Sequence, residues 1–451
     1  MHTNRTFMSR MYRIVFAAAS LLLALQAHAK VDIQHWQTSA GTDVYFVENH
    51  DLPIIDISTN FAAGSARDTK PKAGLAALTR HVMTLGAAGM TDEEISKRLA
   101  DVGAILGGEF DADRAGFNLR TLSSAQERDQ ALDIYTKIMH QPDFPAPILD
   151  REKARVIASL KEAMTRPAAI ASKAFMTNLY GNHPYALEES SEPQTVTSIQ
   201  REDLQQFYSS AYGAKNAIIA MIGDMSRAQA EQIAERIASG LPQTGAVSPL
   251  PEVQNLQQPQ LVRIPHPATQ SHILLGYPGV SRGDPDYFPL YVGNYILGGG
   301  GFVSRLTEEV RENRGLAYSV YSYFMPMAQR GPFQLGLQTK REQTDEALKV
   351  VNETLDKFVR EGVTTEELKA AKQNIVGGFP LRIDSNAKIL DYLAVIGFYK
   401  LPLDYLDNFT KKVESVTAAQ IKDAFTRRLK TDQMLTVIVG GESTPASAAS
   451  R

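Results

Sequence analysis

The sequence predicts an α+β fold of two tandem duplicated domains, each a mostly antiparallel sheet covered by helices. The first observation is a set of four residue pairs that share one offset of 217 residues: Val196/Val413, Ile199/Val416, Leu204/Ile421 and Gly223/Gly440. The second is that both sets follow the same order, a helical stretch and then an apolar strand that ends at the glycine. Several coincident pairs at one spacing indicate an internal repeat.

Each half also begins with predicted strands. Residues 54–58 form an apolar run before a turn at Gly64, and residues 271–277 form the matching run in the second half. Residues 115–122 alternate between the two faces, which is typical of an antiparallel strand with one buried side. Long helical stretches follow in both halves, and helices gathered on one face of such a sheet make an α+β layered domain.

The first 29 residues are typical of a secretory signal peptide. Three arginines precede an apolar run of 12 residues, 14–25, and Ala27-His28-Ala29 fits a cleavage site. The run is shorter than the roughly 20 residues that span a bilayer, so we expect cleavage, with an uncleaved anchor as the alternative. No later segment has the length and apolarity of a membrane span. The chain has no cysteine, which fits export to the periplasm of a Gram-negative bacterium without disulfides.

We expect the following organisation: signal peptide 1–29, N-terminal domain 30–239, linker 240–260, C-terminal domain 261–443 and a disordered tail 444–451. The linker holds four prolines and little apolar periodicity. Without the leader, 44 basic residues face 50 acidic ones, a net charge of −6. This charge gives no reason to expect nucleic acid or an anionic membrane as a partner.

The helical stretch from Gly74 to Gly86 is where metal chemistry is missing. Its sequence, GLAALTRHVMTLG, places an apolar stripe beside Ala77, Arg80 and His81. With the preceding Gly64-Ser65-Ala66-Arg67-Asp68, it resembles the pitrilysin/insulinase family of zinc metallopeptidases. Active members of that family carry H-x-x-E-H here, with two histidines as zinc ligands and a glutamate as general base.

At these positions the sequence departs from the family. Ala77 replaces the first histidine, Arg80 replaces the glutamate, and only His81 remains. The resemblance puts Leu160 at the third ligand position, with Glu162 as the nearest acid. One imidazole beside a permanent positive charge cannot hold zinc, and no two histidines are spaced i, i+4. We therefore expect no metal and no cofactor in this chain, and we interpret His81 as structural.

The second half keeps two polar residues at a spacing of seven, Arg311 and Tyr318. Gly298, Gly299, Gly300 and Gly301 precede a predicted helix with Phe302, Leu306 and Val310 on one face, and Arg311 lies near its end. Gly315 then fits the helix stop, and Tyr318 begins a strand. On residue type alone, Tyr318 is an ordinary strand aromatic and Arg311 a helix-end charge.

The resemblance implies more for these residues. In the family, an arginine and a tyrosine at this spacing bind the substrate backbone opposite the zinc site. A tyrosine hydroxyl can stabilise the developing oxyanion, and a guanidinium can hold a carbonyl without changing its charge. The glycine run is either a turn, a close approach of backbones, or, as in the non-zinc subunit of mitochondrial processing peptidase, a loop that engages substrate.

The expected function is therefore that of a non-catalytic, substrate-binding subunit. Its partner would be a homologous chain with an intact zinc motif, and the pair would be a periplasmic peptidase acting on peptides or unfolded polypeptide. The alternative is an inert structural or peptide-binding member, like the family's core proteins in respiratory complexes. An active homodimer with another metal site lacks any ligand cluster of suitable spacing.

Overall fold

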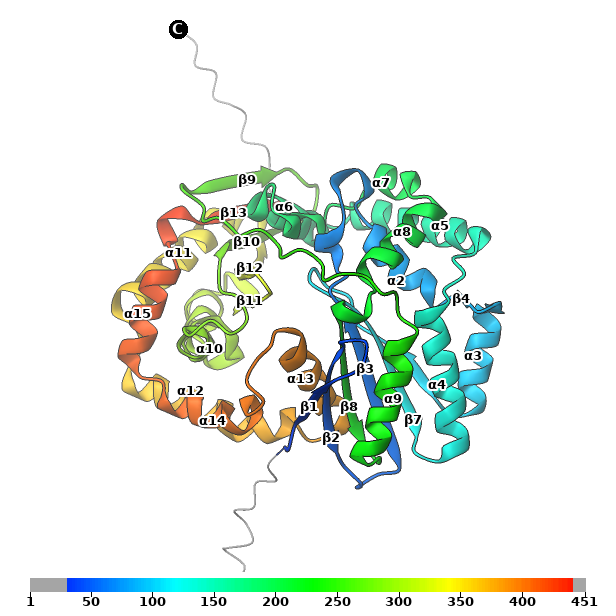
Figure 1. The fold of residues 1–451 in the computed structure, drawn as a ribbon. Helices are drawn as coiled ribbons and strands as arrows, with labels where there is room; N and C mark the ends of the chain where they lie inside the picture. Colours follow the sequence, from blue (N-terminus) through cyan, green and yellow to red (C-terminus); the bar gives the residue numbers. More distant parts are fainter. Residues whose placement is uncertain (1–30, 441–451) are drawn as a thin grey trace, which may run out of the picture.

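The computed structural model describes residues 31–440. The predicted signal peptide and C-terminal tail lie outside the described residues. Two halves lie side by side, each with its own sheet and helices (Figure 1). Within residues 31–440, no helix has the length and apolarity to cross a membrane.

The first half is built on a six-stranded sheet in the order β1-β2-β8-β3-β7-β6. Only β2 and β8 run parallel, and all other neighbours are antiparallel. The strands are β1 Gln34–Gln37, β2 Asp43–Glu48, β3 Ile54–Phe61, β6 Ile105–Gly107, β7 Ala115–Leu122 and β8 Ala217–Gly223, with a separate hairpin of β4 Gly86–Ala87 and β5 Met90–Thr91.

The second half repeats this plan in a five-stranded sheet of order β11-β12-β10-β13-β9. Its one parallel pair, β9 with β13, corresponds to β2 with β8. Gly223 and Gly440 both have positive φ, 139° and 126°. The predicted duplicated α+β fold is thus confirmed. The strands are β9 Gln260–Ile264, β10 Gln270–Pro278, β11 Ala317–Phe324, β12 Pro332–Lys340 and β13 Leu435–Val439.

Helices cover both sheets (Figure 1). Those of the first half are α2 Leu75–Met83, α3 Asp92–Asp101, α4 Ala125–His140, α5 Ala146–Ala163, α6 Pro167–Tyr180, α7 Pro193–Ser198, α8 Arg201–Ala211 and α9 Arg227–Ser239. Those of the second half are α10 Tyr287–Asn294, α11 Thr344–Glu361, α12 Thr365–Gly378, α13 Asn386–Phe398, α14 Tyr405–Ser415 and α15 Ala418–Arg428.

Two of these helices are exchanged between the halves. Helix α6 packs against β10 and β13 of the second sheet, and α13 packs against β8, β3 and β2 of the first (Figure 1). Glycines permit the close approach: a Cβ on Gly276 would collide with the ring of Phe175, and one on Gly397 with Tyr45. Each half therefore completes the core of the other.

Asp113 is a second link between the halves. Its carboxylate is 4% exposed. It accepts hydrogen bonds from the hydroxyls of Tyr185 at 2.7 Å and Tyr399 at 2.9 Å, and from the backbone N–H of Ala328 at 2.7 Å. Tyr399 and Ala328 belong to the second half. Burial raises the pKa of the Asp113 carboxyl, although these hydrogen bonds act in the opposite direction.

The segment from residue 240 to 259 contains neither helix nor strand and lies against both halves. In the first half, Arg67 donates to the carbonyl of Ser248 and His183 lies 2.8 Å from the carbonyl of Pro251. In the second half, the guanidinium of Arg330 bonds the carbonyl of Val253, whose side chain is buried. The segment is therefore a connection that packs against both halves.

Candidate functional site

Helix α2 presents the three positions of the degenerate zinc motif. Asp68 fixes the start of the helix by accepting from the N–H groups of Gly74 and Ala76, both at 2.8 Å. Burial raises the pKa of the Asp68 carboxyl to about 7, against the lowering effect of these hydrogen bonds. Leu78 and Val82 face the core, which leaves the other side of the helix for Ala77, Arg80 and His81.

The side chain of Arg80 turns toward strand β7. Its Nε donates to the carbonyl of Gly116 at 3.2 Å, and its guanidinium lies 5.5 Å from the ring centroid of Phe117. Desolvation by burial lowers the pKa of Arg80, but guanidinium pKa values lie so high that it stays charged. A fixed cation therefore occupies the place where the family's general base would be, one residue from His81.

His81 pairs with a glutamate that the sequence patterns do not single out. Its Nε2 lies 3.0 Å from Oε2 of Glu152, on helix α5, and Glu152 is 2% exposed. Arg151 and Arg155 bond the same carboxylate at 2.8 and 2.9 Å. Burial raises the pKa of Glu152, but hydrogen bonds from Arg151 and His81 outweigh it and leave the pKa below its usual value.

The acid beside His81 is thus Glu152 and not Glu162, which the resemblance made the nearest candidate. Leu160 packs against the first core. The available signal was the pair Glu152 and Arg155, one helical turn apart, within a basic stretch. Sequence spacing alone cannot tell which turn of α5 faces α2.

These residues do not fit a zinc ion. Both oxygens of Glu152 already accept hydrogen bonds from cationic or histidine side chains. Over residues 31–440, no three histidine, aspartate or glutamate side chains gather in a way that could hold a metal. The arrangement can stabilise a helix pair, but it cannot activate water.

The glycine run lies in the second half and is distorted from α-helical geometry on both sides. A π-helical turn covers Tyr295–Gly299, a 3₁₀ turn Gly301–Val303, and a second π-helical stretch Thr307–Glu312. A Cβ on Gly298 would collide with Ser322 and Leu306, and Gly301 has φ +61°. Close approach and a left-handed turn therefore both require glycine here. Short π-helical segments are frequent at functional sites.

Asn294 and Ser322 hold this turn against strand β11. The Asn294 side-chain N–H donates to the backbone carbonyl of Ser322 at 2.8 Å. The Ser322 hydroxyl donates to Oδ1 of Asn294 at 2.7 Å. Both residues are buried. Two reciprocal hydrogen bonds in a low-dielectric setting fix the base of the glycine-rich turn relative to the strand.

Arg311 lies between two exposed aromatic rings. Its guanidinium is 4.9 Å from the ring centroid of Phe302 and 5.0 Å from that of Tyr318. These rings are 73% and 84% exposed. We name Phe302, Arg311 and Tyr318 the arginine sandwich. Nε of Arg311 lies 3.3 Å from Oε1 of the neighbouring Glu312. Stacking on the two rings holds the guanidinium in place while its terminal N–H groups remain able to donate.

The expectation that Phe302, Leu306 and Val310 lie on one face of a single helix is wrong for Phe302. Leu306 and Val310 are buried, but Phe302 belongs to the 3₁₀ turn that Ser304 separates from the following helix. The backbone of Ser304 is extended, with ψ 149°, and interrupts helical geometry between Phe302 and Leu306. Phe302 therefore points to solvent and contacts Arg311 instead of the core.

Tyr318 lies in a bulge of an edge strand. Ala317 pairs with Thr339 and Val320 with Leu337, so β11 holds one residue more than β12 over this interval. Bulges at sheet edges redirect side chains, which accounts for the exposure of Tyr318. Because β11 has a neighbour on one side only, its other side offers backbone groups to an extended peptide.

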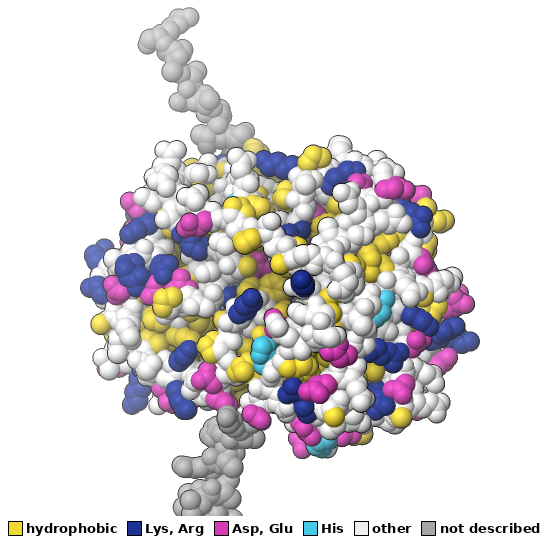
Figure 2. Space-filling model, viewed as in Figure 1, with side chains coloured by type: hydrophobic (Ala, Val, Ile, Leu, Met, Phe, Trp, Pro, Cys, Tyr) yellow, Lys and Arg dark blue, Asp and Glu magenta, His cyan; other side chains and the backbone are white. Residues whose placement is uncertain are grey.

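The structure thus brings Arg311, Tyr318 and the glycine run together, with Phe302 as a further member that the sequence patterns place on a helix face with Leu306 and Val310. Ala77, Arg80 and His81 lie apart from them, on α2 of the other half. Over the face seen in Figure 2, basic and acidic side chains are interspersed on both halves.

Comparisons with known proteins agree with this architecture. The model of the insulinase family (peptidase family M16) matches residues 45–190, and that of the peptidase M16 inactive domain matches residues 198–375. A crystal structure of a peptidase M16 inactive domain from Pseudomonas fluorescens is 37% identical with a TM-score of 0.88, and the match covers 92% of this chain and 99% of that one.

Two further proteins are similar to this chain. The non-peptidase homolog YmxG of Helicobacter pylori is 24% identical over 94% of this chain and 96% of its own length. The periplasmic protease PqqL of Escherichia coli has the same fold, with a TM-score of 0.76 at 14% identity, over 91% of this chain but 46% of PqqL. By its two matched domains and its close structural relative, this chain belongs to the insulinase (M16) peptidase family.

Proposed function

We propose that the chain is the non-catalytic, substrate-binding subunit of a heterodimeric, periplasmic zinc metallopeptidase. The observation that carries this is the arginine sandwich, exposed beside the edge strand β11 in a chain whose α2 cannot hold zinc. A scaffold has no need of a guanidinium held by two exposed rings, because cation–π contacts at exposed sites stabilise a fold by only about 0.5–1 kcal/mol.

The zinc would belong to a homologous partner with an intact H-x-x-E-H. Similarity to an inactive M16 domain and to a non-peptidase homolog supports the absence of catalysis in this chain alone. The matched part of PqqL is about half of that protein, so a chain of its length has room for two such units. This supports a pair of two-domain chains, and the leader-like N-terminus supports the periplasm.

The roles of the residues follow from their geometry. An unfolded polypeptide would add to β11 as a further strand, with hydrogen bonds between backbones. Arg311 would hold a substrate carbonyl, and the Tyr318 hydroxyl would donate to the carbonyl oxygen as it gains charge in the partner's zinc site. Neither side chain needs to exchange a proton with substrate.

The test is reconstitution with a zinc-bearing homologue from the same genome. We expect the pair, and neither chain alone, to cut an unfolded peptide, with zinc in the partner only. Tyr318→Phe and Arg311→Ala should each lower kcat/KM by about tenfold or more. Arg314→Ala is the matched control and should keep activity, because Arg314 lies at the same helix end and is paired with Glu309, while the ring contacts are those of Arg311. Unchanged cleavage by both site variants would refute the assigned roles, and peptide binding without cleavage would favour an inert peptide-holding protein.

A further inference from the structure

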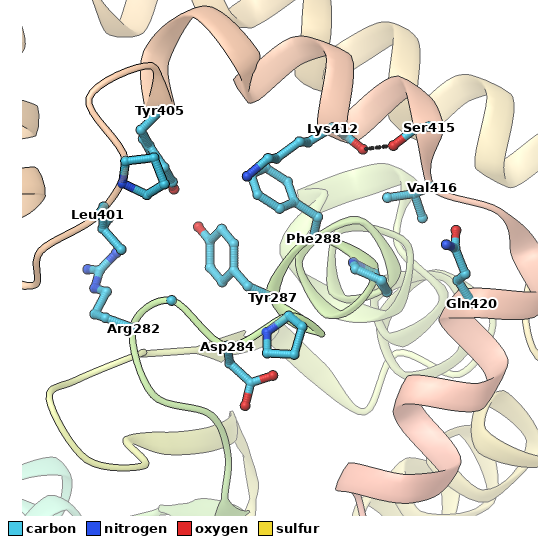
Figure 3. A pocket seen from close by; sticks show the side chains of 14 residues that line it. Arg282, Asp284, Tyr287, Phe288, Leu401, Tyr405, Lys412, Ser415, Val416 and Gln420 are labelled. Carbon is cyan, nitrogen blue, oxygen red and sulfur yellow. Dashed lines mark hydrogen bonds between the residues drawn. The ribbon is translucent and has the colours of Figure 1, made fainter.

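A separate pocket of about 320 Å³ lies in the second half (Figure 3), and none of the residues that line it belongs to the arginine sandwich. It is enclosed by the loop before α10, the turn between α13 and α14, and the C-terminal part of α14. Phe288 and Leu401 supply apolar walls, and Tyr287 and Tyr405 supply rings with hydroxyls. This size and this mixture of apolar walls with a few polar groups are typical of small-molecule sites.

Two cations line the pocket without a carboxylate partner. In residues 31–440, neither Arg282 nor Lys412 has an acidic oxygen within 4.0 Å, and the buried Nε of Arg282 has no hydrogen-bond partner. The one acid in the lining, Asp284, is already bonded by Arg428 at 3.0 Å. In Figure 3, Arg282 and Lys412 lie on opposite sides of the Tyr287 ring. The pocket therefore carries positive charge that no acidic side chain in its lining neutralises.

The cations are fixed against aromatic rings. The Arg282 guanidinium lies 5.3 Å from the ring centroid of Tyr399, and the Lys412 ammonium lies 5.4 Å from that of Phe288. Burial raises the pKa values of the Tyr287 and Tyr405 hydroxyls, and Arg282 acts electrostatically on both in the opposite direction. In Figure 3 the hydroxyls of Tyr287 and Tyr405 lie between Arg282 and Lys412, and these groups together can donate to an anionic oxygen pair.

We infer that this pocket binds a carboxylate with an aromatic or branched aliphatic body. The carboxylate takes the donors of Arg282 and the tyrosine hydroxyls, Lys412 adds charge, and the apolar body lies against Phe288 and Leu401. The same chemistry occurs in a free small acid and at the C-terminus of a peptide. The site does not depend on the proposed peptidase role, since it shares no residue with the arginine sandwich.

Isothermal titration calorimetry on the purified mature chain tests this with N-acetyl-phenylalanine and its amide, which differ only in the carboxylate. We expect the acid to bind with a Kd of about 1 mM or tighter and the amide at least about tenfold more weakly. An acetylated tripeptide that ends in phenylalanine identifies the source: about tenfold tighter binding than the single amino acid assigns a peptide C-terminus, and equal binding assigns a free acid.

Variants locate the binding in this pocket. Arg282→Met and Lys412→Met should each weaken binding of the acid about tenfold. Lys411→Met is the matched control, because Lys411 is the neighbouring residue and lines a different groove. Lys412 is exposed, so its variant keeps the test decisive if Arg282→Met fails to fold. Equal binding of acid and amide, absence of binding by both, or an equal loss with Lys411→Met would overturn the inference.

Discussion

Nε2 of His81 lies 3.0 Å from Oε2 of Glu152, and this pair joins helix α2 to helix α5. In this chain the histidine that remains from a metal motif is one of three donors to a buried carboxylate. Its contacts hold helix α2 against helix α5.

Glu152→Gln should lower the free energy of unfolding by about 1–2 kcal/mol at pH 7, because a buried acceptor of three hydrogen bonds loses its charge. The pKa of Glu152 is lowered in the folded state, so its contribution is present above the unfolded pKa of about 4.3 and is lost as pH falls through the folded value. Urea unfolding at pH 7 and below pH 4 measures the difference. A difference in unfolding free energy between wild type and variant that stays constant with pH would contradict the lowered pKa of Glu152.

Restoring the motif tests whether α2 alone decides metal binding. Ala77→His with Arg80→Glu recreates H-x-x-E-H, and Ala77 is exposed, so a histidine there can face His81 one turn away. We expect the double variant to bind zinc in an equilibrium titration, more weakly than a site with three protein ligands because Leu160 stays in the third position, and the wild type to bind none.

Ala77→His alone is the control. It adds the second imidazole but keeps the Arg80 cation beside the site, and should bind zinc at least about tenfold more weakly than the double variant. Equal zinc affinity in the single and double variants would show that the charge of Arg80 is irrelevant.

The part of the fold that repeats along the chain could be predicted, and the part that depends on packing between the halves could not. Gly223 and Gly440 share a position in their sheets because the duplication preserved it, and the offset is visible in the sequence. The exchange of α6 and α13 leaves no local trace, since amphipathic periodicity shows which face of a helix is buried but not which sheet covers it.

In the candidate site, too, some features could be predicted from the sequence and others depend on packing. The residue types at Ala77 and Arg80 exclude a metal by their chemistry alone, since neither side chain can ligate zinc. The identity of the acid near His81 depends on how α5 is rotated against α2, and the exposure of Tyr318 depends on a bulge that alternation does not reveal. A helical period of 3.6 places Phe302 on one face with Leu306 and Val310 only if the helix is continuous between them, and the extended backbone of Ser304 interrupts it.

Asp113 should make the contact between the halves sensitive to pH. Its folded pKa is raised by burial, so the folded state binds a proton more tightly than the unfolded state does. Stability from this group is therefore greatest at acid pH and decreases as pH rises from about 4 through the folded pKa. Asp113→Asn removes the titration and places an amide among three donors, which should cost about 1–3 kcal/mol.

The measurement for Asp113 is chemical unfolding of wild type and variant from pH 4 to pH 8. The stability difference between them should narrow as pH rises. A difference that widens with pH would mean that the carboxylate is stabilised by its three donors more than burial penalises it, and the assigned direction of the pKa would be wrong.

Substitution of Phe302 should affect substrate binding with little effect on the stability of the chain. Phe302 is 73% exposed and contacts Arg311, which also contacts Tyr318, so Phe302→Ala should change the free energy of unfolding by less than about 0.5 kcal/mol. It should release Arg311 from one of its two rings, at a cost of about 0.5–1 kcal/mol in positioning. In the reconstituted pair this predicts a rise in KM of about two- to fivefold with little change in kcat, because Arg311 binds substrate in both ground and transition states. Phe302→Leu is the control, because leucine keeps apolar bulk but has no π-face. Its KM should rise as much as that of Phe302→Ala if the cation–π contact positions Arg311. Wild-type KM in Phe302→Leu would assign the role to bulk alone, and unchanged KM in both variants would remove Phe302 from the substrate site.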